Sequence, residues 1–443
     1  MNRAPYLIAL LSLSCDGDSG SSSPIPDAQD ILTTHLSLDL ADLSGEAELE
    51  VLPAPGAGFV TLDVAGLELT RVTVDGESVR PKLDGPHARI AVPDAASPLT
   101  VRISYRFSAS SLQEFAGWMP AQGVSFVWPA SCGRLFPCNP SPADGVTFSM
   151  EVTGVDSDLT AVYPTSTFSD APAYMPAIAV GQYVRLDLGT TSAGTQLWAW
   201  YRGGDDGLDR AFAGTEHLVA AFDFFETRYG PYAFGPEAGA VSVDWGSDSY
   251  GGMEHHPFFH VGKFDFSDEE AQIHEAAHGW YGDGVRLACW EDFVLSEGTT
   301  TYITAHATDE LGGPEFWDYY VDDFLVPICT GLDYNAVVLP DETCNEIDFE
   351  QSNLWSLAPY MKGACFYEDV ADLIGQDAVD EAIGEFYAEN VNGAARMGEM
   401  IDRLKSKADP GDAAEIDGLV DEWLRSFECP ADYAARCREH RPR

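Results

Sequence analysis

The chain is 443 residues long and carries 72 Asp and Glu against 24 Lys and Arg, which gives a formal net charge of −48 at pH 7. An imbalance of this size argues against nucleic acid, or an anionic membrane face, as a partner. A solvated acidic surface, typical of exported proteins or of salty habitats, is the simplest interpretation, and it would attract basic peptides. The length is sufficient for two or three domains with sizeable cores.

The first residues predict an export signal. Arg3 precedes the apolar run 6–13, and Cys15 follows shortly after it, which is typical of a bacterial lipoprotein signal. We therefore expect a signal peptide in residues 1–15 and a flexible polar tether in residues 16–32. Lipidation of Cys15 would hold the exported protein at the outer face of a membrane in the bacterial cell envelope.

This signal departs from the usual lipoprotein pattern at one position. Ser12 stands three residues before the cysteine, where such signals usually carry leucine. A plain secreted or periplasmic soluble protein, or a wrongly chosen start codon, is therefore the alternative. No other stretch of the sequence is long enough to span a membrane.

Residues 33–192 alternate apolar and polar side chains with the period of two that predicts β-strands. Turn signals such as Asp75-Gly76 separate the runs, and a Gly/Thr/Ser stretch at residues 189–194 marks the expected end of the domain. We expect an antiparallel β-rich domain here. The alternating apolar positions include Leu36, Leu38, Leu40, Val72, Val74, Val101, Ile103, Tyr105, Phe107, Val184, Leu186 and Leu188.

Residues 193–430 show helical periodicity interrupted by short strand-like runs. Leu208, Phe212 and Phe222 lie on one helical face, and the apolar run 240–244 predicts a strand before further helices. The fold class is therefore predicted to be α+β, with a β-rich N-terminal domain followed by a mixed second domain. Residues 431–443 are expected to form a C-terminal tail.

The strongest functional signal is the run His-Glu-Ala-Ala-His from His274 to His278. Histidines four apart project from one face of a helix, so both imidazoles can bind one Zn²⁺. Glu297 would supply a third ligand, and zinc would acidify a water in the fourth position. Glu275 is adjacent to a ligand and suits the general base. A chance match is the alternative, but two unpartnered histidines and a glutamate would be costly on an apolar helix.

Further motifs accompany this run in a fixed order. Before it come Gly251, Gly252, Met253, Glu254 and His255, and after Glu297 comes Tyr360 in the run Tyr-Met-Lys-Gly-Ala. With the segment 133–138, these motifs resemble the aminopeptidase N family of gluzincin zinc metallopeptidases, which also includes leukotriene hydrolases. The resemblance implies a saddle-like N-terminal sheet domain, a thermolysin-like zinc catalytic domain, and a shortened form without the family's C-terminal helical domain.

The resemblance also implies roles for these residues. Glu254 would hold the free α-ammonium of a substrate, and Gly251 and Gly252 would let the backbone approach the peptide closely. Tyr360 would donate its phenolic proton to the oxyanion. Residues 251–255 together would form the substrate-binding edge, although His255 stands where the family carries asparagine.

One arm of the family's amine clamp is missing from the sequence. Where relatives carry a Glu or Gln that helps to grip the amino terminus, this chain reads Phe-Val-Trp-Pro, with Trp128 as its third residue. Glu254 would then grip the amino terminus alone. This departure leaves open whether the protein acts as an exopeptidase or as an endopeptidase.

These observations predict an exported zinc metallopeptidase with one Zn²⁺ per chain and peptides as substrates, most simply an aminopeptidase. Endopeptidase or epoxide hydrolase action at the same zinc site is one alternative. A non-catalytic surface-binding lipoprotein is another, but such a protein would be expected to have lost Glu275 or Tyr360, and both are present.

Without Cys15, eight cysteines remain, an even number that suits an oxidised framework in an exported protein. Sequence alone does not fix their connectivity. Short loops favour three disulfides and leave a fourth by elimination, and a second zinc site is the alternative. The expected pairs are Cys132–Cys138, Cys329–Cys344, Cys429–Cys437 and Cys289–Cys365.

Overall fold

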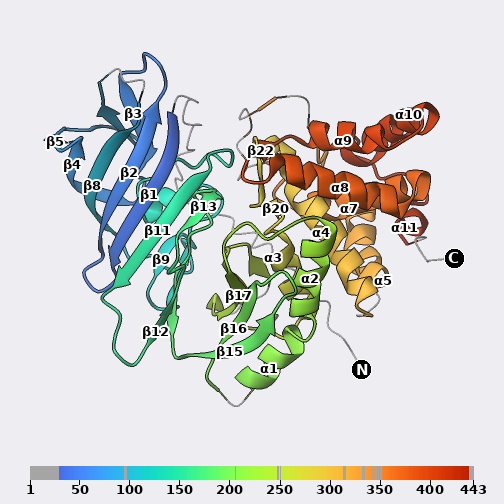
Figure 1. Ribbon diagram of the computed structural model, residues 1–443, viewed down its shortest axis with the longest axis horizontal. Helices are drawn as coiled ribbons and strands as arrows, with labels where there is room; N and C mark the ends of the chain where they lie inside the picture. The colour runs from blue at the N-terminus through green and yellow to red at the C-terminus, as the bar shows by residue number, and fades with distance from the viewer. Residues whose placement is uncertain are drawn as a thin grey trace.

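The computed structural model describes residues 29–438, apart from residues 94–96, 205, 247–248, 250, 313–315, 332–334, 341–342, 345–346, 348 and 350–351. The predicted signal peptide, with Cys15, lies outside the described residues. The chain forms a β-sheet domain followed by a domain rich in helices (Figure 1), so the predicted α+β class is confirmed. Among the described residues, no helix is both long enough and apolar enough to cross a bilayer.

The N-terminal domain is built on a seven-stranded sheet with the order β13-β11-β1-β2-β8-β4-β5. Neighbouring strands run antiparallel, except that β1 and β11 are parallel. Buried residues alternate with more exposed ones along the strands, because successive side chains point to opposite faces. The strands are β1 (Gln29–Asp39), β2 (Ser44–Pro53), β4 (Leu67–Val74), β5 (Glu77–Ser78), β8 (Leu99–Phe107), β11 (Val146–Thr153) and β13 (Phe168–Ala171).

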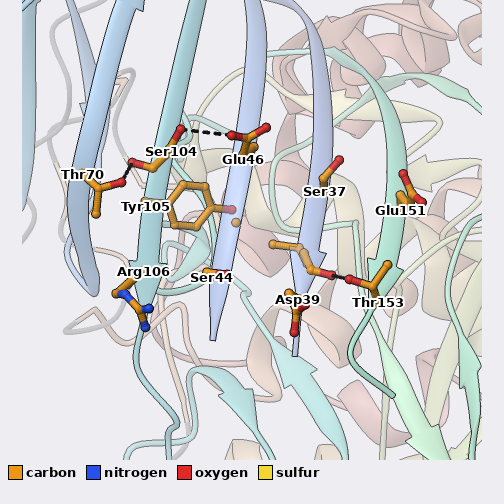
Figure 2. A pocket seen from close by; sticks show the side chains of 12 residues that line it. Ser37, Asp39, Ser44, Glu46, Thr70, Ser104, Tyr105, Arg106, Glu151 and Thr153 are labelled. Atoms are coloured by element: carbon orange, nitrogen blue, oxygen red, sulfur yellow. Dashed lines mark hydrogen bonds between the residues drawn. The ribbon is translucent and has the colours of Figure 1, made fainter. Parts of the chain in front are cut away.

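Two smaller sheets complete this domain, with the orders β12-β14-β10-β9 and β3-β7-β6. A cavity of about 440 Å³ lies along the large sheet. Figure 2 shows its lining side chains, which include Glu46, Ser104 and Arg106. The strands of the smaller sheets are β3 (Phe59–Asp63), β6 (Lys82–Asp84), β7 (His87–Ala91), β9 (Gly117–Met119), β10 (Val124–Phe126), β12 (Thr160–Val162) and β14 (Ala179–Gly181).

The second domain opens with a five-stranded sheet of order β15-β16-β17-β19-β18. The alternation grouped residues 183–190 with the N-terminal strands, whereas β15 pairs with β16 in an antiparallel hairpin of this five-stranded sheet. Strands of either domain share the period of two, so the pattern could not separate them. The strands are β15 (Tyr183–Thr190), β16 (Gln196–Arg202), β17 (Glu237–Val243), β18 (Gly252–Met253) and β19 (Phe258–Gly262).

Helices make up most of the rest of the second domain (Figure 1), with a small sheet of order β20-β21-β22 among them. The long helices α4 and α7 pack against each other, and α3 packs against α4. The helices are α1 (Gly207–Gly214), α2 (Leu218–Arg228), α3 (Glu269–Ala277), α4 (Phe293–Glu310), α5 (Phe316–Tyr320), α6 (Val326–Thr330), α7 (Ala358–Ile374), α8 (Gln376–Asn390), α9 (Met397–Ser406), α10 (Pro410–Leu419) and α11 (Tyr433–Arg436). The short elements are η1 (Cys132–Arg134), η3 (Trp290–Asp292), η4 (Val321–Leu325), η6 (Val420–Leu424), β20 (Tyr281–Gly282), β21 (Val285–Leu287) and β22 (Ala394–Ala395).

Both ends of the described chain are more ordered than the sequence predicts. Strand β1 begins at Gln29, so residues 29–32 of the expected tether pair with β2 instead. At the other end, α11 lies within the expected tail, and Cys437 is bonded to Cys365 of α7. The tail is therefore attached to the second domain.

The four disulfides correct three of the expected pairs. The expected pair Cys132–Cys138 is confirmed. Its two cysteines lie six positions apart, so a short loop is enough to bring them together. The others join residues 55 to 100 positions apart, because the tertiary fold brings distant segments together. Hydrogen bonds join the same distant segments: the buried Lys362 of α7 donates to the carbonyl oxygens of Ala336 and Ser426. The corrected pairs are Cys289–Cys344, Cys329–Cys429 and Cys365–Cys437.

Two glycines set the distance between α4 and α7. A Cβ atom added at Gly363 would lie 2.6 Å from the Cα atom of Gly298, and one added at Gly298 would lie 2.8 Å from the Cα atom of Gly363. Backbone atoms cannot move aside as a flexible side chain can. The close approach of these helices therefore requires glycine at both positions.

We predict that Gly363→Ala lowers the free energy of unfolding by about 1–3 kcal/mol, the usual cost of overpacking. Gly398→Ala on α9 is the matched control, because nothing lies within 4 Å of its added Cβ atom. That control should raise stability by up to about 1 kcal/mol through its helix propensity. Chemical denaturation measures both, and equal effects of the two substitutions would contradict the packing argument.

Candidate active site

Helix α3 carries both histidines of the predicted metal site. It begins after Asp268, whose side chain accepts a hydrogen bond from the backbone N–H of Glu270 and so caps the helix. His274 lies in the last turn and His278 at the C-cap, and their ring centroids are 4.9 Å apart. The spacing of four residues therefore places both imidazoles on one side of the helix, as predicted.

Glu297 on α4 completes the group. Its Oε2 atom lies 3.4 Å from Nε2 of His274 and 3.3 Å from Nε2 of His278, and no hydrogen bond satisfies this oxygen among the described residues. Ligands about 2.0–2.1 Å from a tetrahedral zinc lie roughly 3.3–3.5 Å from one another. The nitrogen and oxygen donors therefore fit a zinc ion. Burial would raise the pKa of Glu297, but the adjacent imidazoles hold it at about 2.

A hydrogen bond to the backbone orients His278. Its Nδ1 atom lies 3.0 Å from the carbonyl oxygen of Tyr281, which accepts a hydrogen bond from the ring N–H. The neutral imidazole then carries its free lone pair on Nε2, the atom that faces Glu297. Contacts of this kind fix the tautomer and the ring orientation of metal-binding histidines.

Glu275 is buried against β18. A Cβ atom added at Gly252 would lie 2.4 Å from Oε1 of Glu275, so the carboxylate fills the space that a side chain would need. The other carboxylate oxygen, Oε2, has no hydrogen-bond partner in the described part of the chain. Burial, together with the charges of Glu254 and Glu297, raises the pKa of Glu275 well above its usual value. A group of this kind accepts protons readily.

Glu254 follows β18, the edge strand of the five-stranded sheet. One carboxylate oxygen each of Glu254 and Glu275 and one ring nitrogen of His278 lie within 4.8 Å of one another. Burial raises the pKa of Glu254 to about 7, and the charge of His278 opposes this shift. The structure thus brings the proposed amine-binding carboxylate and the proposed base to the same side of the metal ligands.

The neighbours of Glu254 have different surroundings. Gly251 has a positive φ of 70° and donates its N–H to Asp265, while Met253 pairs with β19. His255 is only 1% exposed, and its Nδ1 atom lies 3.2 Å from Nδ1 of His260. The side chain of His255 therefore packs within the protein wall, and only its backbone remains a candidate for substrate contact.

Tyr360 reaches the site from α7. Its ring stacks on His274, with centroids 5.8 Å apart and an interplanar angle of 18°. Burial and the charge of Glu297 raise the pKa of Tyr360 well above its usual value. The phenol therefore keeps its proton at neutral pH and can donate it.

Trp128 is the residue that the resemblance aligns with the second arm of the amine clamp. Its side chain is 5% exposed and packs among aromatic rings, with the nearest centroid, that of Trp355, at 4.1 Å. The rings of Tyr174, Trp290 and Phe349 also contact it edge to face. An indole in these contacts gives the site an aromatic wall where the family carries a polar side chain.

One residue that the sequence did not single out lies beside this group. Asp283 is fully buried in the segment after β20, and its electrostatic partners include Glu254 and His278. A lone acid within the otherwise uncharged run Trp280–Val285 is a signal that could have drawn attention to it.

The comparisons with known proteins agree with this geometry. Residues 267–423, which contain all three proposed metal ligands and Tyr360, match the Peptidase family M1 domain. This match covers the segment that carries the site, which is about a third of the chain. A solved M1 zinc metallopeptidase from Deinococcus radiodurans has the same fold, with a TM-score of 0.74 and 20% identity over 92% of this chain and 97% of that one. Yeast LTA4 hydrolase gives a TM-score of 0.74 and 18% identity over 94% of this chain and 69% of that one.

The curated relatives that this chain matches are longer than the chain. Aminopeptidase 2 of Candida albicans is 22% identical over 90% of this chain, which spans only 47% of that protein. Human aminopeptidase B is 26% identical over 58% of this chain and 41% of its own length. This chain therefore spans about half the length of these relatives.

We predict that Gly252→Ala displaces the Glu275 carboxylate and lowers kcat on a peptide substrate by about ten- to a hundredfold, because small misplacements of a catalytic group are costly. The zinc content should not change, since the three atoms nearest to the added Cβ atom all belong to Glu275 and not to a proposed metal ligand. Gly204→Ala is the control, because nothing lies within 4 Å of its added Cβ atom. Wild-type kcat in the Gly252 variant would show that the contact does not position Glu275.

Proposed function

We propose that this protein is a zinc-dependent aminopeptidase that removes N-terminal residues from peptides. The observation that carries the proposal is the buried Glu254 carboxylate beside the three candidate metal ligands, within 4.8 Å of Glu275 and His278 atoms. A carboxylate at that place can hold an ammonium group close to a scissile bond. The names of the relatives support the same activity, since both are aminopeptidases.

His274, His278 and Glu297 would hold the zinc ion. When bound, zinc supplies Lewis acidity, which lowers the pKa of a ligand water toward neutrality. Glu275 is placed to take a proton from the attacking water and to pass one to the leaving amine. Tyr360 donates its phenolic proton to the oxygen of the scissile carbonyl as negative charge develops there.

Endopeptidase action at the same site is the second candidate. The observation in its favour is Trp128, whose indole stands where the family has a second polar arm for the amino terminus. An aromatic wall does not require a free ammonium and would tolerate a longer chain. The two activities differ in how much a free amino terminus on the substrate raises kcat/KM.

Export to the cell envelope, with Cys15 lipidated, remains our proposal for localisation. Four disulfides among the described residues support an oxidising compartment, because such bonds are rare in the cytosol. The sequence of residues 1–15 supports a lipoprotein signal.

We predict that Glu275→Gln keeps about one zinc per chain, because the three ligands are unchanged, while hydrolysis falls by at least about a thousandfold. Metal analysis and peptide hydrolysis of the purified variant measure the two effects. Retention of a tenth of wild-type kcat, a loss of only about 1.4 kcal/mol, would show that Glu275 is not the base.

A further prediction concerns the amino terminus. Acetylation of a good substrate should lower kcat/KM by about ten- to a hundredfold, the worth of one charge-assisted contact. Glu254→Gln should remove most of that difference by slowing only the free substrate. If the wild-type enzyme cleaves the free and the acetylated substrate equally well, the aminopeptidase proposal fails and endopeptidase action is favoured.

A further inference from the structure

The end of α3 leaves the carbonyl group of Glu275 without its usual helical partner. In a continuing α-helix the backbone N–H of Gly279 would donate to this carbonyl oxygen. Here that N–H donates to the carbonyl oxygen of Ala276 instead, at 3.1 Å, because the helix ends at Ala277. The carbonyl group of the proposed base therefore needs another donor, since a buried backbone group without a hydrogen bond is costly.

His256 supplies that donor. Its Nε2 atom lies 2.8 Å from the carbonyl oxygen of Glu275 and carries the ring proton, because a carbonyl oxygen only accepts. The other ring nitrogen, Nδ1, lies 2.8 Å from the hydroxyl oxygen of Tyr232, which donates to it in the neutral ring. His256 is fully buried, so two hydrogen bonds hold the ring within the protein.

Gly279 leaves room for these two rings. A Cβ atom added at Gly279 would lie 3.1 Å from Cε1 of His256 and 2.8 Å from Cε2 of Tyr232. A side chain at this position would therefore press on both rings. The segment after α3 is thus fitted closely around the pair His256 and Tyr232.

The backbone of His256 is bonded to the other functional carboxylate residue. Its N–H donates to the carbonyl oxygen of Glu254 at 2.8 Å, so the chain turns tightly after β18. Through its backbone His256 thus holds the proposed ammonium-binding residue, and through its side chain it holds the proposed base. One carboxylate oxygen of Glu254 and one of Glu275 lie within 4.8 Å of each other.

We propose that His256 is a positioning residue that fixes the distance between the Glu254 carboxylate and the Glu275 carboxylate. This inference rests on the proposed aminopeptidase function and deepens it. An ammonium group held by Glu254 places the first peptide bond at a set distance from that carboxylate, so the base must lie at a matching distance. Without the His256 bond the end of α3 can shift, which slows the chemical step more than it weakens substrate binding.

The test compares His256→Leu with His256→Gln on a tripeptide with a free amino terminus. Leucine has no donor, whereas the side-chain amide of glutamine can place an N–H group near the position of Nε2. His256→Leu should lower kcat by about ten- to a hundredfold and change KM by less than about threefold. His256→Gln should recover most of the lost kcat. Rates are taken per folded, zinc-loaded molecule, so a purely structural role would lower Tm and leave kcat unchanged.

Tyr387→Phe is the matched control. The Tyr387 hydroxyl donates a hydrogen bond to the carbonyl oxygen of Pro231, next to Tyr232 but outside the link between Glu254 and Glu275. This variant loses a hydrogen bond of the same kind and should keep the wild-type kcat. If His256→Leu does not fold, Tyr232→Phe provides the measurement, and it should lower kcat about threefold or more by releasing the ring.

Two results would overturn this inference and leave the aminopeptidase proposal intact. One is a wild-type kcat in the folded His256→Leu variant, or in Tyr232→Phe where that variant replaces it. The other is an equal loss of kcat in the leucine and glutamine variants. The proposed function is decided separately, from the wild-type enzyme alone. If that enzyme cleaves the acetylated tripeptide as fast as the free one, the aminopeptidase proposal fails, and the proposed distance between ammonium group and base fails with it.

Discussion

The structure depends on balancing the negative charge buried around two imidazoles. Glu254, Glu275 and Glu297 are all buried, and the charge of His278 lowers the pKa of each of the three carboxylates. Burial of carboxylates on this scale is unfavourable unless cations accompany them. A metal ion at Glu297 and an ammonium group at Glu254 meet that requirement. The same buried carboxylates would make the protein bind both a metal ion and an ammonium group.

The scaffold that holds these groups consists of three helices and one sheet edge. Helix α3 supplies the histidines, α4 supplies Glu297, and α7 supplies Tyr360. The Gly298–Gly363 contact lets α4 and α7 approach closely, and each glycine is next to, or three residues from, a proposed functional residue. Strand β18 then presents Glu254 from the edge of the sheet. Packing and chemistry therefore depend on the same few positions.

Sequence reasoning reached the features that local spacing determines. The pair His274 and His278 follows from the pitch of a helix, and the alternation in the N-terminal half gave the β-rich domain. Features that depend on tertiary contacts could not be predicted from the sequence. Loop length misassigned three disulfides, because the tertiary fold brings together cysteines that lie 55 to 100 positions apart in the sequence. The strands of both domains share a period of two, so the alternation did not show where the second sheet begins. Asp283 carries no motif of its own, and only its burial distinguishes it.

The central claim, that the buried carboxylates are balanced by a metal at His274, His278 and Glu297, is tested most directly by thermal unfolding of the apoprotein in the presence of zinc. The account predicts binding of one zinc per chain and an increase in Tm, equivalent to about 2.7 kcal/mol at a free zinc concentration a hundred times Kd. In Glu297→Gln the increase at the same zinc concentration should be largely lost. An unchanged Tm in the wild-type protein, or an equal increase in the variant, would contradict the account.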